Sequence, residues 1–233
     1  MISALIIKYL KEHASGPILA LDADPDSNLA TVLGIPMEKT IGDLREQTLK
    51  EIKNLPAGMS KSGYIEAGLH EIIVETEKVD LITMGRSEGP GCYCYINNLL
   101  RKFADDLQSS YDWVVMDNEA GMEHLSRRTA SKVDSLIVVV NQSPLSIDCA
   151  KRIVNLISDL KKEVARKYLL INFVDENKID SVRKKIEGIE IEYLGYVPHD
   201  AALEANIFNG DSFYNLDNTP AVLKIEEIMS KIS

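Results

Sequence analysis

Six short apolar runs, separated by wide intervals that carry helical patterns, constrain this sequence most. None of the runs alternates strictly between apolar and polar residues, which is typical of strands covered on both faces. Parallel strands need crossovers of a dozen or more residues, and the intervals supply them. The pattern predicts an α/β fold with a mostly parallel sheet and helices on both faces. The runs are residues 17–22, 79–84, 113–116, 135–140, 168–173 and 191–197.

Helical spacing of apolar residues predicts helices at 2–12, 97–107, 146–161 and 221–232, and a helix start near Ile179. From about 35 to 77 this rhythm weakens, and three glycines stand in a polar context: Gly58, Gly63 and Gly68. We expect an excursion between strands there, with a short strand at 71–74. Since no linker or repeat interrupts the pattern, residues 1–233 are expected to form a single domain.

Charge and composition exclude several classes of function. Twenty-six Lys and Arg against thirty-six Asp and Glu give a formal net charge of −10, whereas nucleic-acid binding needs a basic surface. No window approaches 18 consecutive apolar residues, the length of a membrane-spanning helix. A secretory signal requires a basic residue before its apolar part, and this N-terminus has none. Three cysteines are too few for a disulfide framework. We expect a cytoplasmic protein that binds neither nucleic acid nor membrane.

Three carboxylates, Asp22, Asp24 and Asp26, come directly after the first predicted strand. Ligands of open α/β sheets bind at the carboxyl ends of the strands, so Asp24, beside Pro25, is a candidate functional residue. The alternative is an acidic turn that caps a helix starting near Asn28.

A second acidic strand end lies at Asp117, followed four residues later by Gly121. An apolar strand that ends in Asp is typical of the residue that holds Mg²⁺ through water in phosphate-loop nucleotidases. Gly121 suits a loop whose backbone amide approaches a phosphate. Asp24 and Asp117 together make a stronger signal than either alone.

Two cysteines, Cys92 and Cys94, lie on a loop that Gly89, Pro90 and Gly91 brace. They supply two of the four ligands that zinc normally takes, so a twofold dimer that presents two such pairs is the economical metal site. The alternative is two unlinked, reduced thiols. Cys149 stands in a helical pattern and is expected to be a buried small hydrophobe.

The sequence contains no Gly-x-x-x-x-Gly-Lys-[Ser/Thr] loop, since none of its thirteen glycines precedes a lysine. Such a loop cradles phosphates with its backbone amides.

These segments resemble the MinD/ParA/nitrogenase-iron-protein class of deviant phosphate-loop ATPases, a P-loop NTPase-like fold of the SIMIBI class. The likeness covers nearly the whole chain through residues 21–29, 113–124, 170–172 and 196–200. The Cys-Tyr-Cys element at 92–94 is similar to the CooC branch, whose members insert nickel into carbon monoxide dehydrogenase.

The resemblance implies roles for particular residues. Asp24 would position the attacking water, Asp117 would hold Mg²⁺ through water, and Gly121 would sense the γ-phosphate. Cys92 and Cys94 would bind Ni²⁺ or Zn²⁺ together with a second subunit of a homodimer. The base of ATP or ADP would be read by Asn172 and lined by Pro198, His199 and Asp200.

The implied function is an accessory ATPase that couples ATP binding, hydrolysis and dimerisation to nickel insertion into a carbon monoxide dehydrogenase-type client. Two alternatives stay open: a non-hydrolysing, metal-carrying scaffold of the same fold, and a MinD/ParA-like partition ATPase. In this class a strand and a phosphate loop precede the first helix, and this sequence lacks both. Either the sequence is an N-terminally shortened form of a working ATPase, or the chain is a degenerate relative.

If the sequence is shortened, codons upstream of Met1 are expected to encode, in frame, a strand and a Gly-Lys-[Ser/Thr] loop. Reading the upstream genomic DNA checks this. An upstream region without such a loop would support the non-hydrolysing scaffold.

Overall fold

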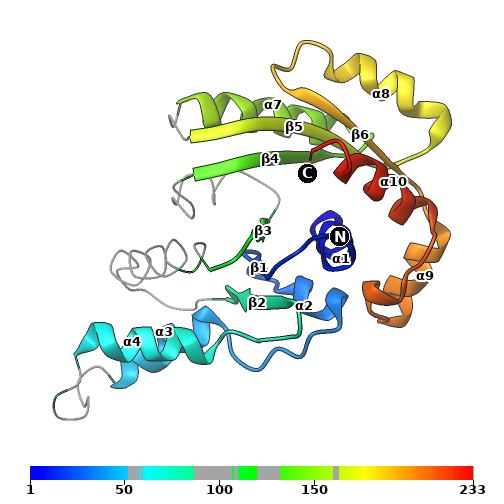
Figure 1. The fold of residues 1–233 in the computed structure, drawn as a ribbon. Helices are drawn as coiled ribbons and strands as arrows, with labels where there is room; N and C mark the ends of the chain where they lie inside the picture. Colours follow the sequence, from blue (N-terminus) through cyan, green and yellow to red (C-terminus); the bar gives the residue numbers. More distant parts are fainter. Residues whose placement is uncertain are drawn as a thin grey trace. The chain divides into compact units, whose positions relative to one another are not determined.

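The computed structural model describes residues 1–51, 58, 60–86, 107, 110–119, 132–159 and 163–232 (Figure 1). The chain divides into two compact units, each discontinuous in sequence. Unit 1 consists of Met1–Glu119 with Gly210–Tyr214, and unit 2 of Ala120–Asn209 with Asn215–Ser233. The single domain expected from the sequence stays a prediction.

The helices and strands follow one another in the order that Figure 1 labels. Those of unit 1 are α1 (Ile2–His13), β1 (Ile18–Asp22), α2 (Asn28–Leu33), α3 (Ile41–Glu51), α4 (Lys61–Glu71), β2 (Val79–Thr83) and β3 (Trp113–Asp117). Those of unit 2 are β4 (Lys132–Val140), α7 (Pro144–Asp159), β5 (Glu163–Val174), α8 (Ile179–Ile186), β6 (Glu192–Pro198), α9 (Ala201–Asn209) and α10 (Pro220–Met229). Short 3₁₀ turns lie at Glu176–Lys178 and Phe213–Asn215.

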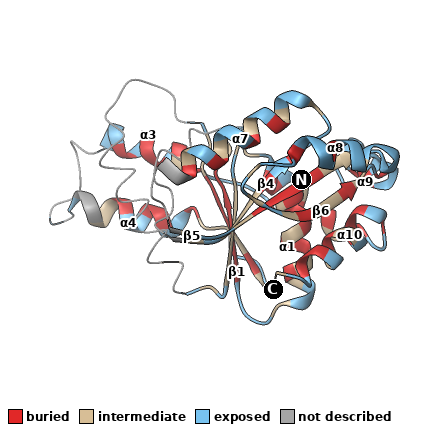
Figure 2. Ribbon diagram, turned by 90° about the horizontal axis from the view of Figure 1, so that it is seen from above, coloured by how far each residue is buried: buried red, intermediate tan, exposed pale blue. Residues whose placement is uncertain are grey.

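Unit 1 is built on a three-stranded parallel sheet in the order β2-β1-β3. All five residues of the central strand β1 are buried, as Figure 2 shows. Because parallel strands run in one direction, β1 and β3 end at the same edge, with Asp22 directly opposite Asp117. The predicted strands of this unit are confirmed.

The helical pair α3 and α4 covers one face of this sheet. Leu19 and Leu21 of β1 form a buried cluster with Leu44 of α3 and Leu69 of α4. Gly68 permits this packing, since a Cβ there would lie 2.2 Å from Leu44 Cδ1. The glycine that weakens the helical pattern in the sequence is therefore a helix-contact residue.

The short strand predicted at 71–74 is wrong. Helix α4 continues to Glu71, and only Val74 makes an isolated antiparallel bridge, with Leu81 of β2. Ser60 caps α4, because its hydroxyl accepts a hydrogen bond from the Gly63 N–H at 3.0 Å. The helix therefore begins in the glycine-containing segment for which the sequence predicted no helix.

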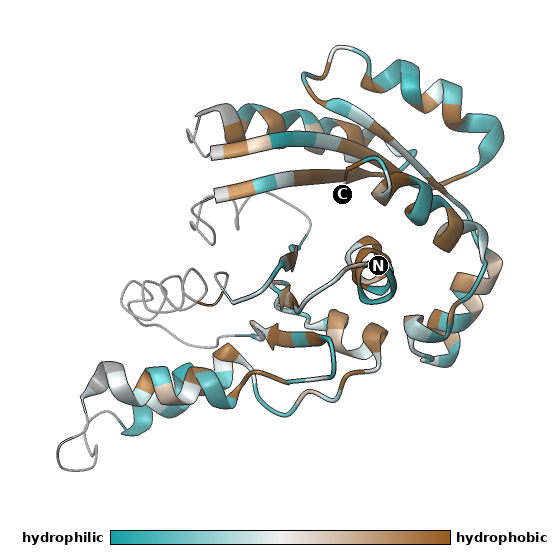
Figure 3. Cartoon of the chain, viewed as in Figure 1, coloured by the Kyte–Doolittle hydropathy of each residue, from teal (hydrophilic) through white to brown (hydrophobic). Residues whose placement is uncertain are grey.

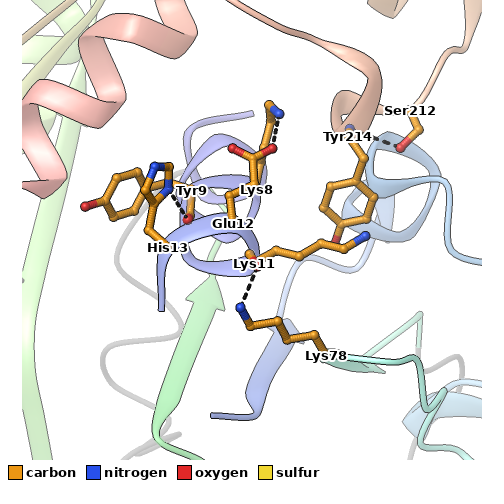
Figure 4. Close-up of polar contacts among 8 residues, drawn as sticks. All are labelled: Lys8, Tyr9, Lys11, Glu12, His13, Lys78, Ser212 and Tyr214. Carbon is orange, nitrogen blue, oxygen red and sulfur yellow. Dashed lines mark hydrogen bonds and ion pairs between the residues drawn. The ribbon is translucent and has the colours of Figure 1, made fainter. Parts of the chain in front are cut away.

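Helix α1 is fixed in unit 1 by contacts near its C-terminus (Figure 4). Lys78 Nζ donates to the Lys11 carbonyl at 2.7 Å, where the last carbonyls of a helix favour a cation. Lys11 Nζ lies 3.7 Å from the ring centroid of Tyr214, and Lys8, which is 2% exposed, pairs with Glu12. The contacts of Lys11 with Lys78 and Tyr214 thus join the C-terminal part of α1 to two other segments of unit 1.

Unit 2 is built on a second three-stranded parallel sheet, in the order β4-β5-β6. Helices α7 and α8 pack on it through Ile147, Ala150, Val182 and Ile186. Figure 1 draws α10 on the opposite side of this sheet, where α10 contacts β6. Figure 3 shows the later half of β4 as hydrophobic, as its sequence predicts. The parallel α/β class with helices on both faces is confirmed.

Three further expectations from the sequence concern the helix at 97–107, the burial of Cys149 and membrane-spanning helices. The predicted helix at 97–107 lies outside the described residues except for Leu107. Cys149 lies in α7, but it is partly exposed rather than buried. No helix in the described part of the chain combines the length and the apolar character needed to cross a membrane.

The contact between Gly34 and Ser212 of the segment 210–214 can be tested by substitution, with Gly188 of unit 2 as the control. Gly34 ends α2 with φ +70°, and a Cβ there would lie 2.8 Å from Ser212 Cβ; Gly188 has φ +86° and no described atom within 4 Å. We expect Gly188→Ala to lower the free energy of unfolding by about 1 kcal/mol, the cost of a left-handed alanine. Gly34→Ala should cost about 2–3 kcal/mol because a steric clash is added. Denaturant unfolding measures both, and equal losses would contradict the contact with Ser212.

Candidate functional site

The carboxyl edge of unit 1 gathers acidic side chains. Strands β1 and β3 end with Asp22 and Asp117 in register, and the Ala23 N–H donates to the Asp117 carbonyl at 2.8 Å. The chain leaves β1 directly into the segment that carries Asp24 and Asp26. The two sequence-predicted acidic strand ends therefore lie beside each other, as a parallel sheet requires.

Asp117 is partly exposed, and its carboxylate accepts a hydrogen bond from a residue far away in the sequence. Ser3 Oγ, in the first turn of α1, donates to Asp117 Oδ1 at 2.7 Å. The contact places the start of α1 at the carboxyl edge of the sheet.

Asp22 is 1% exposed, and both of its carboxylate oxygens accept backbone hydrogen bonds. Oδ2 accepts from the Leu29 N–H at 3.0 Å, and Oδ1 accepts from the Asp24 N–H at 3.1 Å. Burial raises the pKa of the Asp22 carboxyl, and the nearby charges of Asp117 and Asp24 raise it further, whereas these hydrogen bonds lower it only in part. Asp22, rather than a residue next to the helix, thus satisfies an N–H group at the start of α2.

Asp24 lies in a tight turn and is partly exposed. Its Oδ1 accepts from the Asp26 N–H at 2.9 Å, and its carbonyl accepts from the Ser27 N–H at 3.0 Å. Asp26 also forms an ion pair with Arg86 at 2.6 Å, between two exposed side chains. The turn thus holds Asp24, partly exposed, two residues after the end of β1.

The oxygen atoms of this edge are the kind that Mg²⁺ prefers. Among the described residues, no three His, Cys, Asp or Glu side chains converge closely enough to hold a metal on their own. Mg²⁺ commonly keeps several waters and binds through one or two carboxylates together with substrate phosphates. Asp117 and Ser3 fit that mode, in which the protein provides only part of the coordination.

The carboxyl edge of unit 2 carries a second polar group. Asn172 lies near the end of β5, opposite Val197 of β6, and its buried Oδ1 has no hydrogen-bond partner among the described residues. The next residue, Phe173, has φ +53° at a β-bulge, a conformation costing about 1–3 kcal/mol. A buried, unsatisfied acceptor beside a strained residue indicates a place for a ligand donor.

A depression of about 460 Å³ lies at this edge. Pro198 ends β6 and His199 follows it on one side, and Pro220 begins α10. His199 Nε2 lies 2.9 Å from Glu204 Oε1, and its ring meets that of Phe173 edge-on with centroids 6.0 Å apart. The remaining lining residues are Val174, Asp175, Glu176 and Asn177.

The remaining sequence-predicted site residues do not line this depression or lie outside the described residues. Asp200 is buried outside the residues that line the depression, and its carboxylate accepts backbone N–H groups. Gly121, Cys92 and Cys94 lie outside the described residues.

Sequence reasoning gave no role to two residues of the unit 1 edge. Asp22 was named only as one of three carboxylates, although a charged residue that ends an apolar strand is itself a signal. Ser3 gave no local signal, since its contact with Asp117 spans 114 positions.

Comparisons with known proteins agree with this arrangement. The family model described as "CobQ/CobB/MinD/ParA nucleotide binding domain" matches residues 1–213. An uncharacterized ATP-binding protein of Methanocaldococcus jannaschii is 40% identical over 233 residues, covering 99% of this chain and 92% of that relative. The carbon monoxide dehydrogenase accessory protein CooC of Rhodospirillum rubrum is 29% identical over 218 residues, covering 85% of this chain and 79% of CooC.

Solved structures share the fold. The MinD cell division protein of Aquifex aeolicus matches with a TM-score of 0.70 at 18% identity, covering 99% of this chain and 88% of that one. A ParA family ATPase of Chlorobium tepidum matches with a TM-score of 0.71 at 19% identity, covering 97% and 90%.

The buried Asp22 makes stability depend on pH in a defined direction. Because its pKa is raised in the folded state, the folded protein binds more protons than the unfolded chain between the two pKa values. Stability should therefore fall as pH rises through that window, by at most about 1.4 kcal/mol per pH unit. Asp22→Asn removes this titration, so the stability of the variant relative to the native protein should rise with pH. Urea unfolding between pH 4 and 7 measures the difference, and parallel pH curves would contradict it.

Proposed function

Because the chain belongs to the CobQ/CobB/MinD/ParA nucleotide-binding domain family, we propose that it is a Mg²⁺-dependent ATPase that inserts nickel into a client enzyme. In this proposal, ATP binding and hydrolysis are coupled to dimerisation. The client is a carbon monoxide dehydrogenase-type enzyme. The observation that carries the nucleotide part is the buried Oδ1 of Asn172, which has no partner among the described residues and lies two residues before Val174 of the depression in unit 2.

An adenine base fits the chemistry of this edge. Its exocyclic amino group is a hydrogen-bond donor, and Asn172 Oδ1 is an acceptor without a partner among the described residues. Pro198 and the His199 ring offer flat apolar surface for a base. At the wall of the depression, Asp175 pairs with Lys178 at 2.6 Å, and this hydrogen bond lowers the pKa of the Asp175 carboxyl.

The phosphate side of the proposal uses the edge of unit 1. When bound, Mg²⁺ would supply charge stabilisation for phosphoryl transfer to water. Asp117 would hold the ion through water, Ser3 orients that carboxylate, and Asp24 would position the attacking water. Gly121 would contact the γ-phosphate through its backbone.

The metal part of the proposal rests on Cys92 and Cys94 and on the similarity to CooC. Two thiols from each subunit of a homodimer would complete a tetrahedral site for Ni²⁺ or Zn²⁺ as cargo. Nucleotide-driven dimerisation would then assemble the site and hydrolysis would release it.

A partition or cell-division ATPase, the function of the structural relatives, is the second candidate. It commonly requires a membrane-binding helix or a basic surface. The apolar face of α10 is buried through Ile225, Ile228 and Met229, and Lys224 and Lys231 both pair with Glu227. This helix is therefore part of the core, which favours the accessory ATPase.

Nucleotide binding is tested with Asn172→Ala in the full chain encoded by the gene. Loss of one hydrogen bond to the base should weaken MgATP binding about tenfold, while GTP binding stays unchanged. Titration calorimetry measures both. Asn155→Ala, on the exposed side of α7, is the matched control and should bind like the native protein. Unchanged ATP affinity in Asn172→Ala would refute the base contact.

Metal-dependent assembly is tested with the double variant Cys92→Ser and Cys94→Ser. We expect it to remain monomeric when Ni²⁺ or Zn²⁺ is added with MgATP, since the shared thiolate ligands are lost. Size-exclusion chromatography with light scattering measures the mass, and Cys149→Ser in α7 is the control that should still dimerise. A dimer in the double variant would contradict the proposed site. Metal binding without ATP turnover in the native protein would support the scaffold alternative.

A further inference from the structure

Asp200 is a buried carboxylate that directly follows two residues lining the depression. It is 2% exposed, and the preceding Pro198 and His199 form one wall. The family resemblance implies that Asp200 lines the base pocket. Its side chain instead points into the protein, where it contacts backbone groups.

The Asp200 carboxylate joins the first turns of two helices. Oδ1 accepts from the Ala202 N–H at 3.0 Å and from the Leu203 N–H at 3.1 Å, both in α9. Oδ2 accepts from the Ala221 N–H of α10 at 2.8 Å. The first N–H groups of any helix lack internal partners and carry partial positive charge, so one anion satisfies two helix starts at once.

The charge of Asp200 is retained despite burial. Burial alone would raise the pKa of this carboxyl, but the hydrogen bonds from Ala221, Thr219, Leu203 and Ala202 outweigh it and lower the pKa. These partners hold the Asp200 carboxylate as a rigid point, meaning that its position is fixed, because any displacement leaves a charge or an N–H group without a hydrogen bond.

This rigid point lies between two walls of the depression. Pro198 and His199 lead into Asp200, while Pro220 lies between Thr219 and Ala221, which both bond to the Asp200 carboxylate. The His199 N–H donates to the Val174 carbonyl at 3.3 Å, which ties the same wall to β5. The separation of the His199 wall from the Pro220 wall therefore depends on the hydrogen bonds of one side chain.

We propose that Asp200 is a positioning residue that sets the width of the base-binding depression and thereby its preference for adenine. It acts through Pro198, His199 and Pro220 and does not contact the base. The inference rests on the proposed nucleotide function. If Asp200 were only a structural cap, its loss would lower stability without changing the choice of base.

The test compares ATP and GTP affinities of the full chain, well below its unfolding temperature. Asp200→Asn keeps the shape but presents an amide N–H to a backbone donor. We expect it to weaken ATP binding about tenfold and GTP binding little, so the ATP to GTP preference falls by a similar factor. Asp43→Asn is the matched control. Asp43 accepts hydrogen bonds from the N–H and hydroxyl of Thr40 at the start of α3, and this change should not alter the preference.

A milder variant keeps the proposal testable if Asp200→Asn does not fold. Thr219→Val removes one hydrogen bond to Asp200 from the α10 side and should shift the base preference in the same direction, by a smaller factor. Equal weakening of ATP and GTP, or an unchanged preference in a variant with lowered stability, would overturn the positioning role. If the native protein itself did not prefer ATP, the proposed nucleotide function would fail instead.

Discussion

In each unit, an aspartate at a strand end holds backbone N–H groups with a buried carboxylate, and the candidate sites depend on this interaction. Asp22 ends β1 and binds the start of α2, whereas Asp200 follows β6 and binds the starts of α9 and α10. An N–H group buried without a partner would cost about 1–3 kcal/mol. The conformation of the chain where it leaves each strand is therefore strongly determined.

The two aspartates differ in how their charge is balanced. Several hydrogen bonds lower the pKa of Asp200, whereas burial and neighbouring acids raise that of Asp22. A cation near Asp22, Asp24 and Asp117 would relieve that repulsion. The negative charge at the edge of unit 1 thus favours a bound cation. At the edge of unit 2, hydrogen bonds already balance the charge of Asp200, whose role there is to position the neighbouring residues.

The sequence predicted parallel strands because strands covered on both faces have nearly continuous apolar runs, but it did not predict their division between two sheets. It did not predict α3 and α4, because Gly68 reads as a helix breaker although the contact with Leu44 requires it. Asp24 and Asp117 were identifiable because each lies at or beside a strand end, whereas Asn172 was named only through the family resemblance. Ser3 was not identifiable, since tertiary packing alone brings it to Asp117. The inward orientation of Asp200 was also missed, because its partner Ala221 is distant in sequence.

The discontinuity of unit 1 limits how the protein can be divided into fragments. Residues 210–214 belong to this unit although their neighbours on both sides belong to unit 2. Within this short segment, Ser212 Oγ donates to the Leu33 carbonyl at 2.6 Å and Tyr214 lies against Lys11. A fragment that stops at Glu119 would leave both partners unmatched. A single cut in the chain therefore cannot yield an intact unit 1, and an exchange of this unit between relatives would have to include both segments.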